Sequence, residues 1–470
     1  MTAQTILPAN SVVDTGFATN SLRFNRGSTD YLNRTLGTPT NVDKATFSTW
    51  VKFSDVTSSN DTAIFAATAD GNNTTHLEKL GSQVFRLNMR EGSNYIGVLT
   101  TNRVFRDPSA WYHIVVAFDT NQGTEANRVK LYINGVQETS FSTATYPTQN
   151  VDLRFNTSGQ VFNIGNRGDT GNHPDAYYAE TVFIDGQQLA ADQFGEFDSD
   201  SPSVWKPIDV SGLTFGDNGF YLQFKGSGTS ANSSGMGADT SGNDNHLTVN
   251  NLTAIDQSLD TCTNNHCTQN PIDTDANVVL SEGNLKVSNA NNSYYSSCGT
   301  LAPVKGRWYF EAKVVSLGVF NVGITKATQD GTVHAQVDAG RVAYSSNGNL
   351  YDDSGDPLSD TSTTFGANDI IGVFLDLESG TQAVHFQKNG ADVVSRNLAD
   401  SYSGYTGGFK AAFGMGENDT TSGLINFGAP PFAISSSNSD ANGYGDFEYS
   451  PVRSSLNYYT LNTKNLAEFG

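Results

Sequence analysis

Paired carboxylates are the residues of this chain that most directly suggest chemistry, because a glycoside hydrolase needs two of them. A retaining hydrolase holds its carboxyl groups about 5 Å apart, and on one strand this needs an even spacing that puts both on one face. Glu180 and Asp185 in ETVFID have an odd spacing, and Glu417 and Asp419 in GENDTT lie in a turn-like context. These patterns predict surface charges, not a catalytic pair.

Serine and histidine do not predict a nucleophilic site either. The sequence has no G-x-S-x-G elbow, and its seven histidines are scattered. His113 in WYHIVV and His385 in VHFQ lie in strand-like segments without the third member of a triad. The glycine-rich GSGTSANSSG has no lysine and opens no helix, so it is no phosphate loop. We therefore expect no catalytic residue and a protein that is not an enzyme.

The cysteines give only a weak metal signal. CTNNHC spaces Cys262, His266 and Cys267 as C-x3-H-C, but no second Cys/His pair follows, and Cys298 stands alone. We expect free thiols, no metal and no cofactor. Acidic loops such as FDSDSP (197–202) could supply oxygens to a structural calcium ion, which stays open although they lack an ordered ligand spacing.

Two polar loops with aromatic residues are the best candidates for ligand binding. The loop at 345–362 holds Tyr351, Asp352 and Asp353, and DSYSGYTGG (400–408) holds Tyr402 and Tyr405. Aromatic faces beside carboxylates and amides suit sugar rings, and sandwich loops displayed by a rigid frame form recognition surfaces. The alternative is an ordinary soluble loop, in which exposed Tyr and Asp are common.

Short alternating segments predict the elements that position these loops. WYHIVVAF (111–118) is apolar on both faces of a strand, as in the interior of a sandwich. GRWYFEAKVV (306–315) alternates as a half-buried antiparallel strand does, and DIIGVFLDLESG (369–380) is a strand running into a turn. No segment has the apolar repeat of an amphipathic helix or a coiled coil. The fold class is therefore all-β, with two tandem antiparallel β-sandwiches (jelly rolls).

Three dipeptides predict hairpin turns. Asn134-Gly135, Asp185-Gly186 and Asn389-Gly390 each follow an apolar strand, and both residue types tolerate the positive φ of a type I′ turn. Turn geometry explains these glycines without a ligand.

Composition suggests where the domains begin and end. The 470 residues exceed one ordinary core, and residues 261–277 have almost no apolar periodicity. We expect an N-terminal arm at 1–20, a first sandwich at 21–255, a linker at 256–277, a second sandwich at 278–435 and a C-terminal tail at 436–470.

Charge excludes some partners. Lys and Arg number 27 against 48 Asp and Glu, a formal charge of -21, so phosphate backbones and anionic lipids would be repelled. We expect no nucleic-acid partner. The first 20 residues lack the basic and apolar regions of a secretory signal, and no stretch has the length of a membrane span, so we expect cytoplasmic synthesis and no membrane insertion.

Two parts of the chain resemble known families. Over roughly 1–255, SLRFNRGSTDYLNRT, ATFSTWVKF, WYHIVVAFDT, VKLYINGVQ and FNIGNRGD resemble, in order, a LamG-like, concanavalin A-like lectin/glucanase jelly roll. Over roughly 278–433, GRWYFEAKV, VGIT, DIIGVFLDLESGTQAVHFQKNG and INFGAPPFA resemble a SPRY domain.

The order of these parts resembles virion proteins of tailed bacteriophages. A LamG-like sandwich ending in DTSGNDNHLTVNNL is followed by LDTCTNNHCTQNP, the SPRY-like part and YTLNTKNL. Cys262 stands where that family often has proline. The resemblance implies a virion component, such as a tail fibre or head decoration, that contacts other virion proteins, forms a homo-oligomer and adheres to a host-surface glycan or protein. A glycan-active hydrolase and a purely architectural head or tail component are the alternatives.

Overall fold

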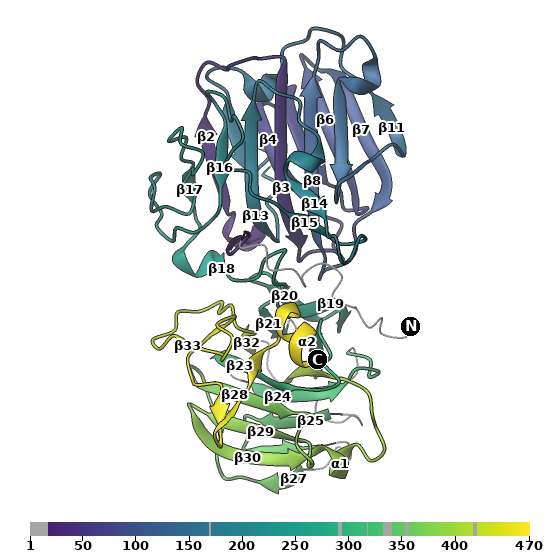
Figure 1. Cartoon of the computed structure of the whole chain (residues 1–470). Coiled ribbons are helices and arrows are strands. Elements are labelled where there is room, and N and C mark those ends of the chain that lie inside the picture. The colour runs from purple at the N-terminus through teal and green to yellow at the C-terminus, as the bar shows by residue number, and fades with distance from the viewer. Residues whose placement is uncertain are drawn as a thin grey trace. The chain divides into compact units, whose positions relative to one another are not determined.

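The computed structural model describes residues 17–168, 171–289, 294–316, 318–331, 341–352, 357–416 and 421–470. The chain divides into two compact units between residues 263 and 264. We call residues 17–263 the N-terminal unit and residues 264–470 the C-terminal unit. Nearly all regular structure in both is β-strand (Figure 1), which confirms the predicted fold class.

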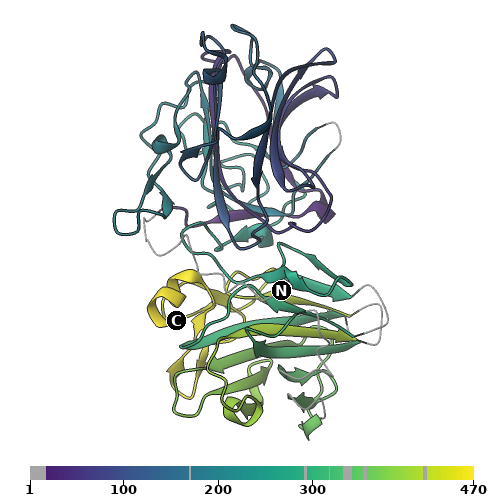
Figure 2. The same cartoon turned by 90° about the vertical axis from the view of Figure 1, so that its right-hand side faces the viewer.

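The N-terminal unit is a sandwich of two antiparallel sheets, which Figure 2 shows as separate layers. The first sheet runs through β10 (Val136–Gln137), β9 (Val129–Ile133), β8 (Trp111–Asp119), β3 (Lys44–Phe53), β13 (Ala176–Asp185), β1 (Ser21–Phe24) and β18 (Gln257–Ser258), with β16 (Phe220–Leu222) also paired to β13. The second runs through β11 (Phe141–Thr145), β7 (Asn94–Val104), β6 (Val84–Glu91), β5 (Asn73–Lys79), β4 (Thr62–Asp70), β12 (Val161–Ile164), β2 (Tyr31–Thr35) and β17 (Thr248–Asn250).

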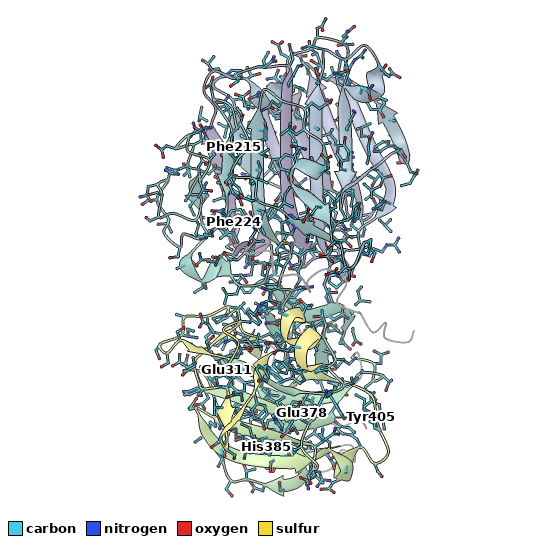
Figure 3. All side chains as sticks on the ribbon, viewed as in Figure 1. Phe215, Phe224, Glu311, Glu378, His385 and Tyr405 are labelled. Carbon is cyan, nitrogen blue, oxygen red and sulfur yellow. The ribbon has the colours of Figure 1, made fainter. Side chains whose placement is uncertain are left out.

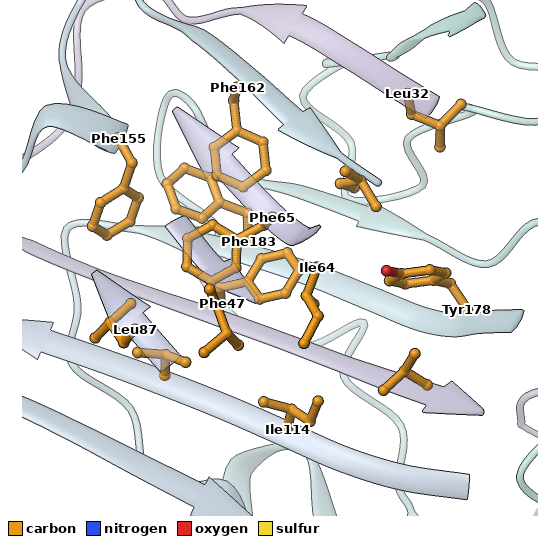
Figure 4. Close-up of a cluster of buried hydrophobic side chains, with 14 of the residues drawn as sticks. Leu32, Phe47, Ile64, Phe65, Leu87, Ile114, Phe155, Phe162, Tyr178 and Phe183 are labelled. Carbon is orange, nitrogen blue, oxygen red and sulfur yellow. The ribbon is translucent and has the colours of Figure 1, made fainter. Parts of the chain in front are cut away.

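Aromatic side chains fill the space between these two sheets (Figure 4). The ring centroids of Phe47 on β3 and Phe65 on β4 lie 4.5 Å apart, and Phe162 on β12 stacks on Phe65 at 5.8 Å. The outer face of the first sheet is buried as well, in a second cluster that includes Trp50 and Trp111. Both faces of β8 are therefore covered, as its apolar sequence predicted.

The C-terminal unit is a second sandwich. One sheet runs through β19 (Gln269–Thr274), β22 (Tyr295–Gly299), β31 (Phe409–Gly416), β24 (Val319–Lys326), β25 (Arg341–Ser345), β26 (Asn349–Tyr351) and β27 (Pro357–Asp360). The other runs through β20 (Val278–Ser281), β21 (Lys286–Asn289), β32 (Ser422–Asn426), β23 (Arg307–Ser316), β28 (Ile370–Asp376), β29 (Ala383–Lys388) and β30 (Ala391–Asn397). A short strand, β37 (Tyr459–Thr460), pairs in parallel with β23.

The remaining elements are short. They are the ribbons β14 (Gly195–Phe197) with β15 (Trp205–Pro207), β33 (Asn438–Ser439) with β34 (Asp446–Phe447) and β35 (Val452–Arg453) with β36 (Leu456–Asn457), the 3-10 helices η1 (Arg26–Ser28), η2 (Glu125–Asn127), η3 (Arg154–Asn156), η4 (Ala191–Gln193) and η5 (Ala254–Asp256), and the helices α1 (Leu398–Ser401) and α2 (Thr463–Phe469). Among the described residues, no helix has the length and apolar character needed to cross a membrane.

The segments expected as linker and tail are parts of the two folded units. Residues 257–258 form β18 of the N-terminal unit, and residues 269–274 form β19 of the C-terminal unit. The tail packs back on β23, and its residue Leu461 accepts a hydrogen bond from the Cys267 backbone N–H at 2.9 Å. The strand pairings in these segments are short or irregular, because β18 has only two residues and the register of β19 shifts between Gln269 and Thr274, so the sequence shows no long alternation.

The tail also changes the environment of β23. Trp308 and Phe310 face the core as predicted, but Tyr309 and Glu311 on the other face are buried too. The expected half-buried strand is therefore covered on both sides, because Phe447 and Tyr458 of the tail pack over Tyr309.

Two of the three predicted hairpins are present. Asn134-Gly135 joins β9 to β10 with φ of 49° and 80°, and Asn389-Gly390 joins β29 to β30 with the same two values. Asp185-Gly186 does not form a hairpin. Asp185 ends β13, and its carboxylate accepts the backbone N–H groups of Thr40 and Asn218 at 2.7 and 3.1 Å, so it ties loops together.

Candidate functional site

The predicted ligand-binding residues lie in the C-terminal unit and are mostly buried. Tyr351, Asp352 and Tyr402 are 9%, 8% and 4% exposed, and Tyr405 is partly buried (Figure 3). Asp353 lies outside the described residues. The first three side chains therefore offer little surface to a sugar ring.

These residues join the two loops to each other. Asp352 Oδ2 accepts hydrogen bonds from Arg396 Nη2 at 2.9 Å and from Ser401 Oγ at 3.1 Å, so the two predicted loops meet at this carboxylate. The Lys326 ammonium lies 5.3 Å from the ring centroid of Tyr402 and 5.9 Å from that of Tyr405. The tyrosine faces are thus engaged by a cation of the same chain, and Tyr405 keeps the most surface for a ligand. A ligand role for the set stays a prediction.

The first carboxylate pair of the sequence, Glu180 and Asp185, does not form a common site. Glu180 and Asp185 have separate partners, because Asp185 binds the loops at Thr40 and Asn218 whereas Glu180 accepts from Ala18 and Tyr221. Glu417 and Asp419 lie outside the described residues.

His113 has the wrong hydrogen-bond pattern for a general base. The Trp205 indole N–H, which can only donate, lies 2.9 Å from His113 Nδ1, so Nδ1 accepts and a neutral ring carries its proton on Nε2. Burial lowers the pKa of His113 to about 3, which keeps the ring neutral. Nε2 therefore donates to Ser48 Oγ at 2.8 Å, whereas a catalytic histidine must accept the serine proton. Ser48 and His113 form a structural pair.

His385 also lacks a triad. It lies partly buried on β29 (Figure 3), and its Nδ1 has no hydrogen-bond partner. Burial, and then the nearby charge of Arg453, lowers the pKa of this imidazole.

The cysteines of CTNNHC lie in different cores. Cys262 packs with the outer cluster of the N-terminal unit, whereas Cys267 belongs to the core of the C-terminal unit. His266 Nδ1 lies 3.1 Å from the carbonyl oxygen of Phe427. Within the described ranges, no group of three or more His, Cys, Asp or Glu side chains is placed to hold a metal ion.

The acidic loop FDSDSP, considered for calcium, has partners within the protein. The Asp198 carboxylate accepts from the Ser201 N–H and lies 3.1 Å from Lys206 Nζ.

Sequence reasoning missed a buried carboxyl site around Glu180. This residue is 6% exposed and lies at a β-bulge of β13, where the register with β3 shifts between Ala179 and Val182. Ala18 N–H donates to Oε1 at 3.1 Å, and the Tyr221 hydroxyl donates to Oε2. Burial raises the pKa of Glu180 to about 7. The available signal was a charged residue inside the apolar run AYYAETVFID.

A small cavity adjoins this carboxyl. Its volume is about 10 Å³ and its lining includes Ser48, His113 and Glu180, which gives room for about one water molecule. A sugar ring does not fit, so the raised pKa, which would suit a general acid, has no substrate to act on here.

Glu311 is a second buried carboxylate that the sequence did not reveal (Figure 3). It accepts the Tyr309 hydroxyl at 3.0 Å and the backbone N–H groups of Glu448 and Tyr449 at 3.1 and 2.8 Å. Burial raises its pKa. Glu311 therefore fixes the tail on the outer face of β23.

Glu78 is the third. It is fully buried on β5 and accepts from Arg86 Nε at 2.9 Å, and His76 Nε2 lies 3.3 Å from it. Burial alone would raise the pKa of Glu78, but the hydrogen bonds and charges of His76 and Arg86 outweigh it and hold the pKa at about 2. The alternating T-x-H-x-E of this strand was its only signal. Each of the three carboxylates thus serves as an acceptor within the scaffold.

Comparisons with known proteins identify the two sandwiches. Residues 26–189 match the family model of the concanavalin A-like lectin/glucanases superfamily, and residues 307–428 match that of the SPRY domain. The chain thus contains a LamG-like, concanavalin A-like domain followed by a SPRY domain. No curated protein matches the chain.

Solved structures show more distant likenesses. The SPRY domain of human HERC1 is 14% identical, covering 33% of this chain and 96% of that one with a TM-score of 0.28. A second human SPRY domain is 19% identical, covering 33% and 96% with a TM-score of 0.26. The heptameric SAP-like pentraxin of Limulus polyphemus is 15% identical, covering 38% and 81% with a TM-score of 0.29. The two family models suggest a carbohydrate- or protein-binding module.

Proposed function

We propose that this protein is a non-enzymatic component of a tailed-bacteriophage virion that presents its sandwich loops to a host-surface glycan or protein. The observation that carries the proposal is the order of the two domain types in one chain, a concanavalin A-like sandwich followed by a SPRY sandwich. Its place is a tail fibre or head decoration, where it contacts other virion proteins and forms a symmetric homo-oligomer.

The buried carboxylates support a role in display. Asp185 and Glu311 tie loops and tail to the sheets, so the exposed loops stand on rigid supports, as recognition surfaces require. Charge agrees with this role, because stacking and hydrogen bonds can bind a neutral glycan despite a net charge of -21.

Two aromatic side chains are the places to look for glycan contact. Tyr95, at the start of β7, is 59% exposed, with the Arg90 guanidinium carbon 5.2 Å from its ring centroid. Tyr405 is the more exposed of the two predicted tyrosines of the 400–408 loop. Tyr95→Ala and Tyr405→Ala should each be tested for binding to host cell-wall glycans, with Tyr95→Phe and Tyr405→Phe, which keep the aromatic ring, as matched controls.

The decisive experiment is cryo-electron microscopy of purified particles combined with a polysaccharide-hydrolysis assay of the isolated chain. We expect a fixed copy number per particle, outward loops and no hydrolysis. Absence of the chain from particles would refute the virion role.

The same experiment separates the two alternatives. Hydrolysis abolished by replacing one Glu or Asp would favour a glycan-active hydrolase. A particle in which both sandwiches are covered by other virion proteins would favour a purely architectural component.

A further inference from the structure

Three polar side chains share the outer face of β6 in the N-terminal unit. Every second side chain of this strand belongs to the core between the two sheets. These core-facing residues are Phe85, Leu87 and Met89. Because successive side chains of a strand point to opposite faces, Arg86, Asn88 and Arg90 project from the outer face of the second sheet.

The neighbouring strands continue this outer face. β5, β6, β7 and the edge strand β11 are successive strands of the second sheet (Figure 1). Asn88 pairs with His76 on β5 and with Val98 on β7, and Arg86 pairs with Thr100 on β7. Residues that lie directly opposite each other in antiparallel strands have side chains on the same face. Asn88 is therefore surrounded on this face by side chains of three strands.

The outer face is closed on one side and accessible on the other. On the β5 side, Glu78 is fully buried, and Arg167 Nη1 lies 3.9 Å from its Oε2. On the β7 side, Val98 and Thr100 are partly exposed, and residues 142–145 of β11 are exposed. A ligand can therefore reach Asn88 over β7.

Asn88 has a buried polar atom that is not satisfied by the protein. Its side chain is buried, the residue is 6% exposed, and its Oδ1 forms no hydrogen bond with any part of the chain that the structure describes. Buried polar groups nearly always have a partner, so an unpaired one points to a bound molecule. A sugar hydroxyl suits this position, because it both donates and accepts and can pair with either end of the amide.

Arg90 supplies a positive charge beside this amide. Its Nη1 donates to the carbonyl oxygen of Gly71 at 2.8 Å, its Nε has no hydrogen-bond partner, and it forms no ion pair among the described residues. The adjacent carboxylate of Glu91 lies 3.8 Å from the guanidinium of Arg154 instead. The exposed ring of Tyr95 has its centroid 5.2 Å from the guanidinium carbon of Arg90.

Arg86 contributes less charge to a ligand. Its Nε donates to Glu78 Oε1 at 2.9 Å, so a buried carboxylate already neutralises it. The guanidinium that remains for an anion on this face is that of Arg90.

We propose that the outer face of β6 and β7 binds an acidic oligosaccharide, in which a uronate carboxylate pairs with Arg90 and a ring hydroxyl pairs with Asn88. A guanidinium matches the planar geometry of a carboxylate, and Tyr95 offers an aromatic face to the sugar ring. The net charge of -21 does not oppose this contact strongly, because charges more than about 8 Å away are largely screened at physiological salt. The inference rests on the glycan-binding part of the proposed function and names the class of sugar.

An oligosaccharide array probed with the full chain tests this site. The array carries uronate-bearing oligosaccharides and their carboxyl-reduced counterparts, which keep the same rings without the charge. We expect the uronate forms to bind about tenfold more tightly, and this preference to weaken as salt is added. No binding to the uronate forms, or equal binding of both forms, would overturn the proposal.

A charge variant and its control assign the preference to Arg90. Arg90→Gln should abolish the preference for the uronate forms. Arg106→Gln removes the same charge from an exposed position beyond the end of β7 and should leave the preference unchanged. A uronate preference that survives Arg90→Gln would refute the assignment.

Asn88→Val separates binding from folding. Valine suits a strand and removes a polar group that has no partner in the protein, so we expect the Tm of the N-terminal unit to stay the same or rise. The affinity for both sugar forms should fall severalfold because the hydroxyl contact is lost. Unchanged affinity would show that Asn88 does not contact the sugar.

This inference and the virion role can fail separately. The array uses the isolated chain, whereas the virion role is tested on purified particles. A chain that is present in particles but does not bind uronates would overturn this inference alone. A chain that binds uronates through Arg90 but is absent from particles would overturn the virion role alone.

Discussion

The two sandwiches contain the same hairpin in different surroundings. Asn134-Gly135 and Asn389-Gly390 share their φ values, and each asparagine extends the sheet by one more pair of hydrogen bonds. Asn134 Oδ1 accepts the N–H of His113 at 2.8 Å, and Asn389 Oδ1 accepts that of Ile370 at 2.9 Å. The asparagine N–H groups return these contacts to the carbonyls of the same two residues.

The difference lies in what covers each glycine. A Cβ on Gly135 would lie 2.4 Å from the Trp205 ring, and one on Gly390 would lie 2.7 Å from the Tyr449 ring. Trp205 is buried and donates a hydrogen bond to His113, whereas Tyr449 lies in the tail and is partly exposed. The dipeptide therefore determines the turn, but the covering segment determines how much the turn matters to its unit.

The largest difference between the two units should be their stability in acid. His113 is neutral when folded, with a pKa of about 3 against about 6.5 when unfolded, so its contribution is complete above pH 6.5 and is lost as pH falls towards 3. The loss amounts to about 5 kcal/mol at most. Calorimetry from pH 7 to pH 3.5 should show the transition of the N-terminal unit moving to lower temperature faster than that of the C-terminal unit.

His113→Gln is the control for that prediction. Glutamine can accept from Trp205 and donate to Ser48 but does not titrate. An unchanged acid sensitivity in this variant would assign the effect to other groups, of which Glu78, with a pKa of about 2, is the first to examine.

Gly135→Val should be the most damaging hairpin substitution. A β-branched residue resists positive φ, and its Cβ would overlap the buried Trp205 ring, so we expect a loss of about 3 kcal/mol. Urea denaturation followed by tryptophan fluorescence measures this loss. An unchanged midpoint would mean that the turn is not under the constraint seen here.

Gly390→Val tests the same turn conformation where the ring over the glycine, Tyr449, is partly exposed. The strain at φ of 80° is equal, but the Tyr449 ring is partly exposed and can move, so we expect about 1–2 kcal/mol. Urea denaturation of the C-terminal unit measures this loss in the free energy of unfolding. If both substitutions cost the same free energy of unfolding, backbone strain alone would account for the two losses.

The smallest effect should come from the asparagines. Asn134→Ala removes one side-chain hydrogen bond to the neighbouring strand and a residue suited to positive φ, for about 1 kcal/mol. Asn389→Ala removes the matching bond and also the donation from Asn389 Nδ2 to Asp369 Oδ1 at 2.7 Å, so its loss should be slightly larger. Asn134→Asp keeps the acceptor and serves as control, whereas an aspartate at position 389 would face the Asp369 carboxylate. Equal losses would show that the contact to Asp369 adds nothing to the stability of the C-terminal unit.

The loops of the candidate site show where sequence reasoning stopped. Tyr351, Asp352 and Tyr402 have the composition of an exposed recognition loop, yet all three are buried. Arg396 and Ser401 bind Asp352, and the Lys326 ammonium lies over the ring of Tyr402. These partners of Asp352 and Tyr402 lie tens of residues away in the chain, so local composition could not reveal the burial. The same applies to Glu180, whose partners Ala18 and Tyr221 are distant in sequence.

The sequence by itself determined the β class, the two sandwiches and the hairpins at Asn134 and Asn389, because strand alternation and turn conformation depend on a few neighbouring residues. Only the tertiary structure decided that Asp185-Gly186 ties loops instead of turning a hairpin, since its partners at Thr40 and Asn218 come from elsewhere in the unit. It also decided that Glu180 and Glu311 are buried. Which segment covers the outer face of a sheet depends on long-range packing, and that cover, not the strand's own residues, determines whether a carboxylate there is a surface charge or a buried acceptor.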